Sequence, residues 1–238
     1  MSYWALSHRP KYSLLFALPL LVGYELLAVA LSGGAMAGVR NGADVLLKSL
    51  FVTFGGRAGL LVFGLLLLGA GAGPVWRDRA AGGPLRWRVF LGMIAEAVGY
   101  ASVFGLVTAT LTGLLLGRAT PLAAGQFDRL ALPTQIMISL GAGLYEELLF
   151  RVLLVGTLAW VARRSLGWRA GAAGGAATVV GALIFSGFHY VGPYGDPLEL
   201  GSFAFRAVAG ALFSGLYLLR GFGIVAWTHA MYDLLLVG

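Results

Sequence analysis

Two adjacent glutamates and an arginine lie inside an otherwise apolar stretch, GLYEELLFR, at residues 143–151. A charged side chain at the bilayer centre costs roughly 2.5–3.5 kcal/mol on insertion scales, so such residues usually face a bundle interior and serve a function. Residues four apart share one face of an α-helix, which predicts that Glu147 and Arg151 pair and mainly support the structure. Glu146 points about 100° away around the axis and stays free. A free carboxylate in such surroundings is suited to general acid or base catalysis.

Two later apolar stretches also carry ionisable side chains. The segment FSGFHY contains His189, and the segment WTHAMYD contains His229 and Asp233, which are four residues apart and therefore share a helical face. Together with Glu146, these groups form the ligand and base set that water-activating chemistry requires. The sequence therefore predicts that the chemistry belongs to the C-terminal half of the chain.

The composition is that of an integral membrane protein. Of 238 residues, 59% are hydrophobic and 11% are charged, about half the charged share of a soluble domain. Several apolar runs reach the ~20 residues that cross the hydrocarbon core, and residues 1–238 are expected to form one membrane domain in contact with the lipid bilayer. The net charge of +7 is attributed to loop topology, so no nucleic-acid partner is expected. The absence of cysteine excludes thiolate metal ligands and a cysteine nucleophile.

The predicted fold class is an all-α polytopic bundle of about seven transmembrane helices. An eighth, amphipathic or re-entrant segment is predicted near residues 37–53. Basic clusters fall on one side of the seven-span arrangement, which predicts a cytoplasmic N terminus. The expected spans are residues 12–32, 54–73, 89–117, 133–161, 171–191, 200–219 and 222–238.

Three spaced motifs carry a family resemblance. EELLFR matches EExxxR, FSGFH matches FxxxH and HAMYD matches HxxxN/D, and they occur in the order found in the CAAX protease and bacteriocin-processing (CPBP) family of intramembrane endopeptidases. The chain resembles this family, which includes the Ras-converting CAAX endopeptidase, over a catalytic core of about residues 133–238. The resemblance implies that Glu146 and His189 act on a water molecule, that Glu147 and Arg151 support the site, and that His229 and Asp233 complete it.

The resemblance also implies partners and a location. The expected substrates are membrane-anchored peptides or proteins, such as lipidated tails, leader peptides or anchor peptides. The expected location is the plasma (inner) membrane of a prokaryote. No oligomeric state follows from the sequence.

Two mechanisms remain open because the last motif ends in Asp233, whereas the Ras-converting members resemble one another in having asparagine there. In the metal-free mechanism, Glu146 deprotonates a water held by His189, and His229, oriented by Asp233, stabilises the oxyanion. In the alternative mechanism, Glu146, His189, His229 and Asp233 are candidate ligands of a Zn²⁺ ion that activates the water. We favour the metal-free mechanism.

Other functions are compatible with the same residues. Buried Glu, His and Arg side chains also form proton relays in transporters and channels, in which case Glu25, Glu96 and Arg206 are expected to line the same path. A non-catalytic family member that acts as a scaffold or immunity protein is a third reading. Counting the helical rise raises a geometric difficulty, because it puts Glu146 near mid-membrane, His189 near one end of its span and His229 towards the other side. We therefore expect at least one span boundary to differ from this assignment.

Overall fold

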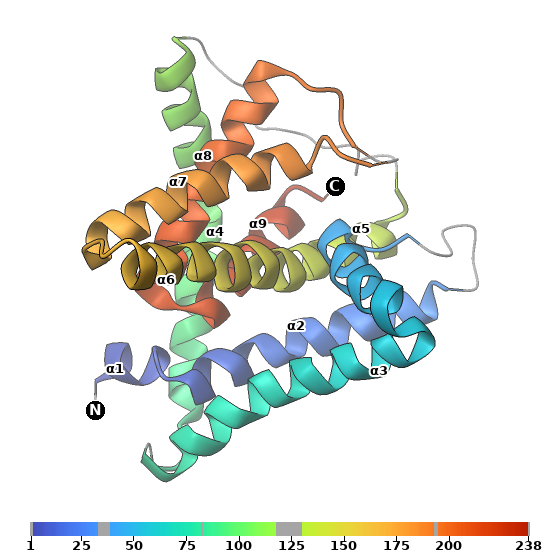
Figure 1. Ribbon diagram of the computed structural model, residues 1–238, viewed down its shortest axis with the longest axis vertical. Coiled ribbons are helices and arrows are strands. Elements are labelled where there is room, and N and C mark those ends of the chain that lie inside the picture. Colours follow the sequence, from blue (N-terminus) through green and yellow to red (C-terminus); the bar gives the residue numbers. More distant parts are fainter. Residues whose placement is uncertain (1, 33–38, 82, 118–129, 193–194, 238) are drawn as a thin grey trace.

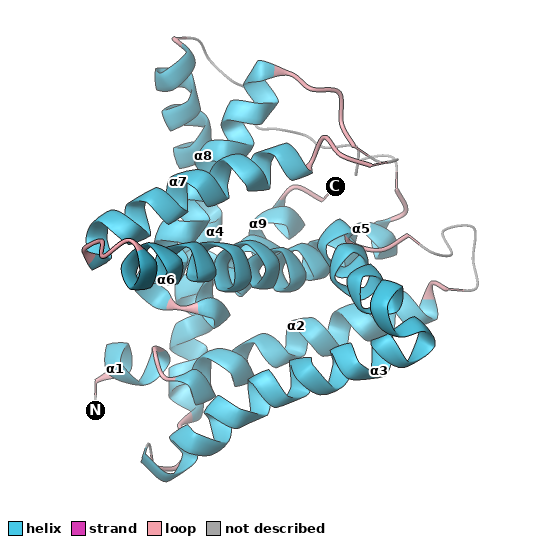
Figure 2. Ribbon diagram, in the orientation of Figure 1, coloured by secondary structure: helices cyan, strands magenta, loops and turns pink. Residues whose placement is uncertain are grey.

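The computed structural model of the chain describes residues 2–32, 39–81, 83–117, 130–192 and 195–237. These residues form helices joined by loops, with no strand among them (Figure 2). The predicted all-α polytopic bundle is therefore confirmed. In chain order the helices are α1 (Tyr3–Ser7), α2 (Pro10–Ala30), α3 (Gly42–Ala81), α4 (Trp87–Leu116), α5 (Leu132–Gly141), η2 (Ala142–Val155), α6 (Gly156–Ser165), α7 (Ala170–Phe188), α8 (Leu200–Arg220) and α9 (Phe222–Leu235).

Five of the described helices are long and apolar enough to cross a membrane: α2, α3 over Gly42–Asp78, α4, α7 and α8. The last helix, α9, has 14 residues. At 1.5 Å per residue it is about 21 Å long, which is less than the ~30 Å hydrocarbon core. The predicted full span over residues 222–238 is therefore wrong in length, although a helix does form there.

Helices α5, η2 and α6 follow one another without a break and form one rod through the middle of the molecule (Figure 1). This rod corresponds to the span predicted over residues 133–161. Its middle third, η2, is a π-helix, a winding that is rare and usually limited to a single turn at functional sites. The rod packs against α2, α7 and α9, so it occupies the centre of the bundle.

Helix α3 has two arms that meet at Gly56, where φ is +55° and ψ is −143°. Only glycine adopts such a conformation without strain, which allows the sharp bend that Figure 1 shows between the two arms. The first arm corresponds to the amphipathic or re-entrant segment predicted near residues 37–53, of which residues 37 and 38 lie outside the described part of the chain. One face of this arm, with Ala43, Asp44 and Leu47, is buried. The arm therefore packs into the bundle and carries residue 41 to its interior.

Small residues set the distance between η2 and α9. A Cβ atom added to Gly143 would lie 2.4 Å from the carbonyl oxygen of Ala226 and 2.6 Å from the Cβ atom of Ala230. In lipid no hydrophobic force drives helices together, so close van der Waals packing at small residues is what joins them. This contact lies one helical turn from Glu147 on η2 and faces the turn of α9 that carries His229.

A polar cluster at the end of α8 holds the N-terminal helix α1 against the bundle. The guanidinium of Arg220 at the end of α8 forms an ion pair with Glu96 of α4. The Tyr3 hydroxyl donates a hydrogen bond to the same carboxylate at 2.5 Å, and Trp4 lies under the Arg220 guanidinium at 3.8 Å. This cluster anchors α1 to α4 and α8 by contacts separate from those of the EELLFR segment.

A substitution at the η2–α9 contact tests this packing. We expect Gly143→Ala to lower the melting temperature in detergent, because the new methyl group meets backbone that has no room to move, and overpacking typically costs about 1–3 kcal/mol. Gly99→Ala in α4 is the matched control, because a Cβ atom there would meet nothing within 4 Å. Equal melting temperatures for the two variants would contradict the close approach.

Candidate active site

Glu147 lies between two basic groups and is fully buried. Its Oε2 atom is 3.1 Å from Nε of Arg151, so the ion pair predicted from their spacing is present. Its Oε1 atom is 2.6 Å from Nδ1 of His229, a contact that the sequence did not indicate. A single carboxylate therefore joins η2 to α9.

The guanidinium of Arg151 is held by aromatic rings more than by hydrogen bonds. It lies 4.3 Å from the ring centroid of Phe185 in α7 and 5.3 Å from that of Phe213 in α8. Its Nη2 atom reaches the carbonyl oxygen of Gly210 at 3.5 Å. The contact with Glu147 is short but poorly aligned for a hydrogen bond. Charge and ring contacts, rather than a two-pronged hydrogen bond, therefore position this arginine.

Glu146, the neighbouring residue, is also buried but pairs with no arginine or lysine side chain among the described residues. Its Oε1 atom accepts a hydrogen bond of 2.8 Å from the side-chain amide of Asn41. No described residue donates a hydrogen bond to Oε2. His189 and His229 both interact electrostatically with its carboxylate, so the three groups predicted to do chemistry share one part of the bundle.

His189 follows the last residue of α7 and caps that helix. Its Nδ1 atom is 2.9 Å from the carbonyl oxygen of Phe185, which fixes the proton on Nδ1, and no described residue bonds to Nε2. Its ring packs edge-on against the rings of Phe185 and Phe188. The Nε2 lone pair is therefore available to a substrate or a water molecule.

The sequence assigned Glu146 and His189 to different depths in the membrane, but the structure brings these two residues together. Helices α6 and α7 are joined by the short segment 166–169, and α7 runs back along both α6 and η2. Glu146 and His189 are nearly equidistant from the turn along the chain. The boundaries predicted for these two spans, 133–161 and 171–191, lie within four residues of the ends of the rod and of α7.

The expected link between His229 and Asp233 is weaker than predicted. Their closest atoms, Nε2 and Oδ2, are 3.7 Å apart, which is too long for a hydrogen bond. Glu147 instead holds the His229 ring through Nδ1, and Phe213 stacks on it with centroids 4.4 Å apart. The expectation that Asp233 orients His229 is therefore corrected: Glu147 does so, and Asp233 lies beside the other ring nitrogen.

The side chains do not fit the Zn²⁺ ion considered from the sequence. Among the described residues, no three histidine, aspartate or glutamate side chains converge in a way that could hold a metal ion. Nδ1 of His229, Nδ1 of His189 and Oε1 of Glu146 form hydrogen bonds within the protein, whereas Nε2 of each ring and Oε2 of Glu146 form none with a described residue.

The residues that a proton path would require lie in different places. Glu25 pairs with Arg40 and Lys48, Glu96 pairs with Arg220, and Arg206 pairs with Asp196. These are three separate ion-pair clusters: the first connects to Glu146 through Asp44, Tyr24 and Asn41, and no contact between described residues links either of the other two clusters to it. This separation disfavours the transporter reading.

Sequence reasoning missed Asn41. The residue lies in RNGADVLLKS, within the segment near residues 37–53, and no spacing or motif there indicates that its side chain reaches Glu146. The only available signal was local: an Asx residue just before an apolar run is typical of a helix N-cap.

Comparison with known proteins bears on the C-terminal half. Residues 128–235 match the family model described as type II CAAX prenyl endopeptidase, Rce1-like. The match supports assignment of this part of the chain to the CAAX protease family. The match confirms the family predicted from EELLFR, FSGFH and HAMYD. With the five apolar helices, it makes the chain an integral membrane protein. No curated protein and no solved structure matches the chain.

The buried ion pair of this CAAX protease segment can be tested by removing one partner or both. We expect Arg151→Met to destabilise the protein by roughly 3–5 kcal/mol, because it leaves the Glu147 carboxylate with one cationic partner fewer in a buried site. The double variant Glu147→Gln/Arg151→Met should regain much of this loss, since no unpaired charge remains. Thermal unfolding in detergent measures both. A single variant as stable as the wild type would contradict the role given to Arg151.

Proposed function

We propose that the chain is an intramembrane endopeptidase that hydrolyses peptide bonds of membrane-associated substrates with a water molecule activated by Glu146 and His189. The observation that carries the proposal is the state of the Glu146 carboxylate: one oxygen is held by Asn41, and the other is open and near two histidines. A buried carboxylate so arranged is able to take a proton from a bound water molecule. The family match to a CAAX prenyl endopeptidase supports the same reaction class.

In the proposed first step, Oε2 of Glu146 removes a proton from a water molecule, which keeps its second proton and donates a hydrogen bond through it to Nε2 of His189. The hydroxide attacks the scissile carbonyl carbon, and the carbonyl π electrons move to the oxygen. Glu146 then returns the proton to the amide nitrogen as the C–N bond breaks. The products are a carboxylic acid and an amine, and water is the only other reactant.

His229 is assigned to the oxyanion. Its Nδ1 atom is fixed by Glu147, so the ring cannot turn, and its Nε2 atom points away from that contact. A proton on Nε2 makes the ring a donor to the oxyanion, and the carboxylates of Glu147 and Asp233 balance its positive charge. Glu147 and Arg151 thus act by positioning this histidine.

The proposed substrates are peptides or proteins held in the membrane by a lipid or an apolar segment: lipidated tails, leader peptides or anchor peptides. The support for this class of substrates is the burial of Glu146 among apolar helices. A peptide reaches such a buried carboxylate more readily from the bilayer than from bulk water. The plasma membrane of a prokaryote, with a cytoplasmic N terminus, remains the proposed location.

The central test removes the proposed base. We expect Glu146→Gln to lower the cleavage rate on the order of 10²- to 10⁴-fold, the usual contribution of general base catalysis, while the variant folds normally. Glu199→Gln is the matched control, because it makes the same chemical change at an exposed residue. Mass spectrometry of membranes that contain each variant measures the released peptides. Full cleavage by Glu146→Gln would refute the proposal.

Metal removal provides an independent test. Because no three candidate ligands converge among the described residues, we expect purified enzyme to keep its cleavage rate after dialysis against a strong chelator. Elemental analysis should find well under one zinc ion per chain. Loss of activity on chelation that added Zn²⁺ restores would overturn the metal-free mechanism.

A further inference from the structure

Asn41 makes two directional contacts with one side chain. Its Oδ1 atom accepts the backbone N–H of Ala43 at 2.9 Å and so caps the start of α3. Its Nδ2 atom donates to Oε1 of Glu146 at 2.8 Å. The Ala43 N–H is purely a donor, so the amide oxygen must face it and the amide nitrogen must face Glu146. The capping contact therefore fixes which end of the amide reaches the carboxylate.

The backbone of residue 41 is held as firmly as its side chain. Its N–H group donates to the hydroxyl oxygen of Tyr24 at 3.2 Å, and that hydroxyl donates to Oδ2 of Asp44 at 2.8 Å. Asn41 is 3% exposed, and Asp44 is fully buried. Neither end of Asn41 can move without breaking buried hydrogen bonds, which are costly to leave unmade.

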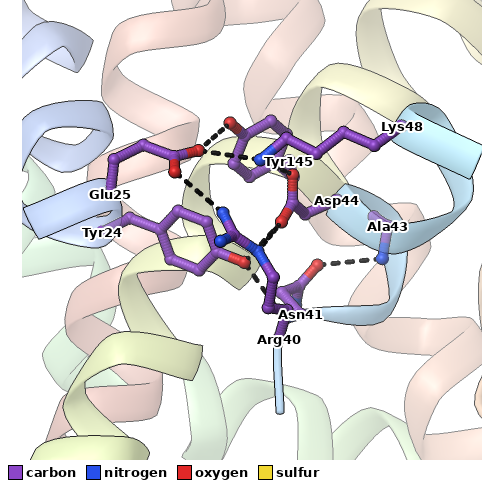
Figure 3. A network of polar contacts seen from close by, with 8 residues as sticks. All are labelled: Tyr24, Glu25, Arg40, Asn41, Ala43, Asp44, Lys48 and Tyr145. Carbon is purple, nitrogen blue, oxygen red and sulfur yellow. Dashed lines mark hydrogen bonds and ion pairs between the residues drawn. The ribbon is translucent and has the colours of Figure 1, made fainter. Parts of the chain in front are cut away.

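A network of charges surrounds these contacts (Figure 3). Asp44 binds Arg40 at 2.5 Å and Lys48 at 2.7 Å. Glu25 of α2 binds the same two cations, at 2.8 and 2.9 Å. Two carboxylates and two cations balance, so the network adds no net charge beside Glu146.

Two details strengthen this network. The Tyr145 hydroxyl donates to Glu25 at 2.8 Å, so the residue just before Glu146 is tied to the network as well. Burial lowers the pKa of Arg40, but its hydrogen bonds to Glu25 and Asp44 outweigh this and hold the pKa above its ordinary value. The network therefore fixes both the donor residue and the backbone next to the acceptor.

We propose that Asn41 is a positioning residue for the reaction, which holds Oε1 of Glu146 so that Oε2 faces the water molecule. This inference rests on the proposed function and extends it to a residue outside the matched segment 128–235. A carboxylate with both oxygens free turns about its terminal bond, whereas one anchored oxygen leaves a single direction for the other. An amide N–H donated to a carboxylate also favours the ionised form that a general base requires.

The alternative is that Asn41 only caps α3. A cap requires Oδ1 alone, and serine caps helices about as well as asparagine does. Asn41→Ser therefore separates the two roles, because its hydroxyl replaces the capping oxygen but is too short to reach Glu146 at the same time. Asn41→Asp also keeps a capping oxygen, yet it replaces the donor with a second carboxylate.

We expect Asn41→Ser to lower kcat on the order of 10- to 100-fold, the loss of one hydrogen bond to a charged group, with KM changed by less than about twofold. Asn41→Asp should have a lower kcat than Asn41→Ser, because like charges then face each other. Asn41→Ser should keep a melting temperature close to that of the wild type, whereas Asn41→Asp should lower it, because it buries a second carboxylate against Glu146. The assay uses purified full-length protein in detergent and a fluorogenic membrane-anchored peptide that the wild type cleaves.

Glu96→Gln, which breaks the separate ion pair with Arg220, is the control for destabilisation alone. It should lower the melting temperature while kcat per folded enzyme stays unchanged. A wild-type kcat for Asn41→Ser would overturn the positioning role, and so would a kcat loss that merely tracks the fall in melting temperature. Activity in Glu146→Gln would instead refute the proposed function, so the two failures are distinguishable.

Discussion

The structure depends on one buried carboxylate, that of Glu147. An ionised group removed from water costs several kcal/mol unless it is paired and bonded. Here the pairing partners come from Arg151 at 3.1 Å and His229 at 2.6 Å. Because the Arg151 guanidinium also lies against Phe185 and Phe213, this carboxylate indirectly joins η2 to α7, α8 and α9. The helices that carry the three motifs are held together by the same residues that define the first motif.

The pairing of Glu147 gives the two adjacent glutamates, Glu146 and Glu147, different roles. Both carboxylate oxygens of Glu147 contact structural partners. The carboxylate of Glu146 faces another direction, and one of its oxygens stays open. The N-terminal half of the chain takes part through the first arm of α3, which delivers Asn41 to Glu146 and is itself fixed by a neutral set of ion pairs. We infer that the motif-bearing helices supply the reacting groups and that the N-terminal helices supply their orientation.

The contacts within one helix and the positions of the helices were predictable from the sequence, because both depend on local patterns of residues. The Glu147–Arg151 pair follows from residues four apart, and it persists in the π-helical winding of η2. The helix positions follow from runs of apolar residues. Contacts across the bundle were not predictable, because they depend on how helices turn about their axes. The Glu147–His229 bond and the 3.7 Å gap between His229 and Asp233 belong to this class. Asn41 was missed for the same reason, since it lies 105 residues from its partner.

The central claim is that Glu146 acts as a base on water and does not attack the substrate itself. A single-turnover cleavage in water labelled with oxygen-18 tests this directly, with mass spectrometry of both the released peptide and the enzyme fragment that contains Glu146. The account predicts one labelled oxygen in the new carboxyl group of the product and none in Glu146. Label in the Glu146 carboxylate, or an unlabelled product, would contradict it.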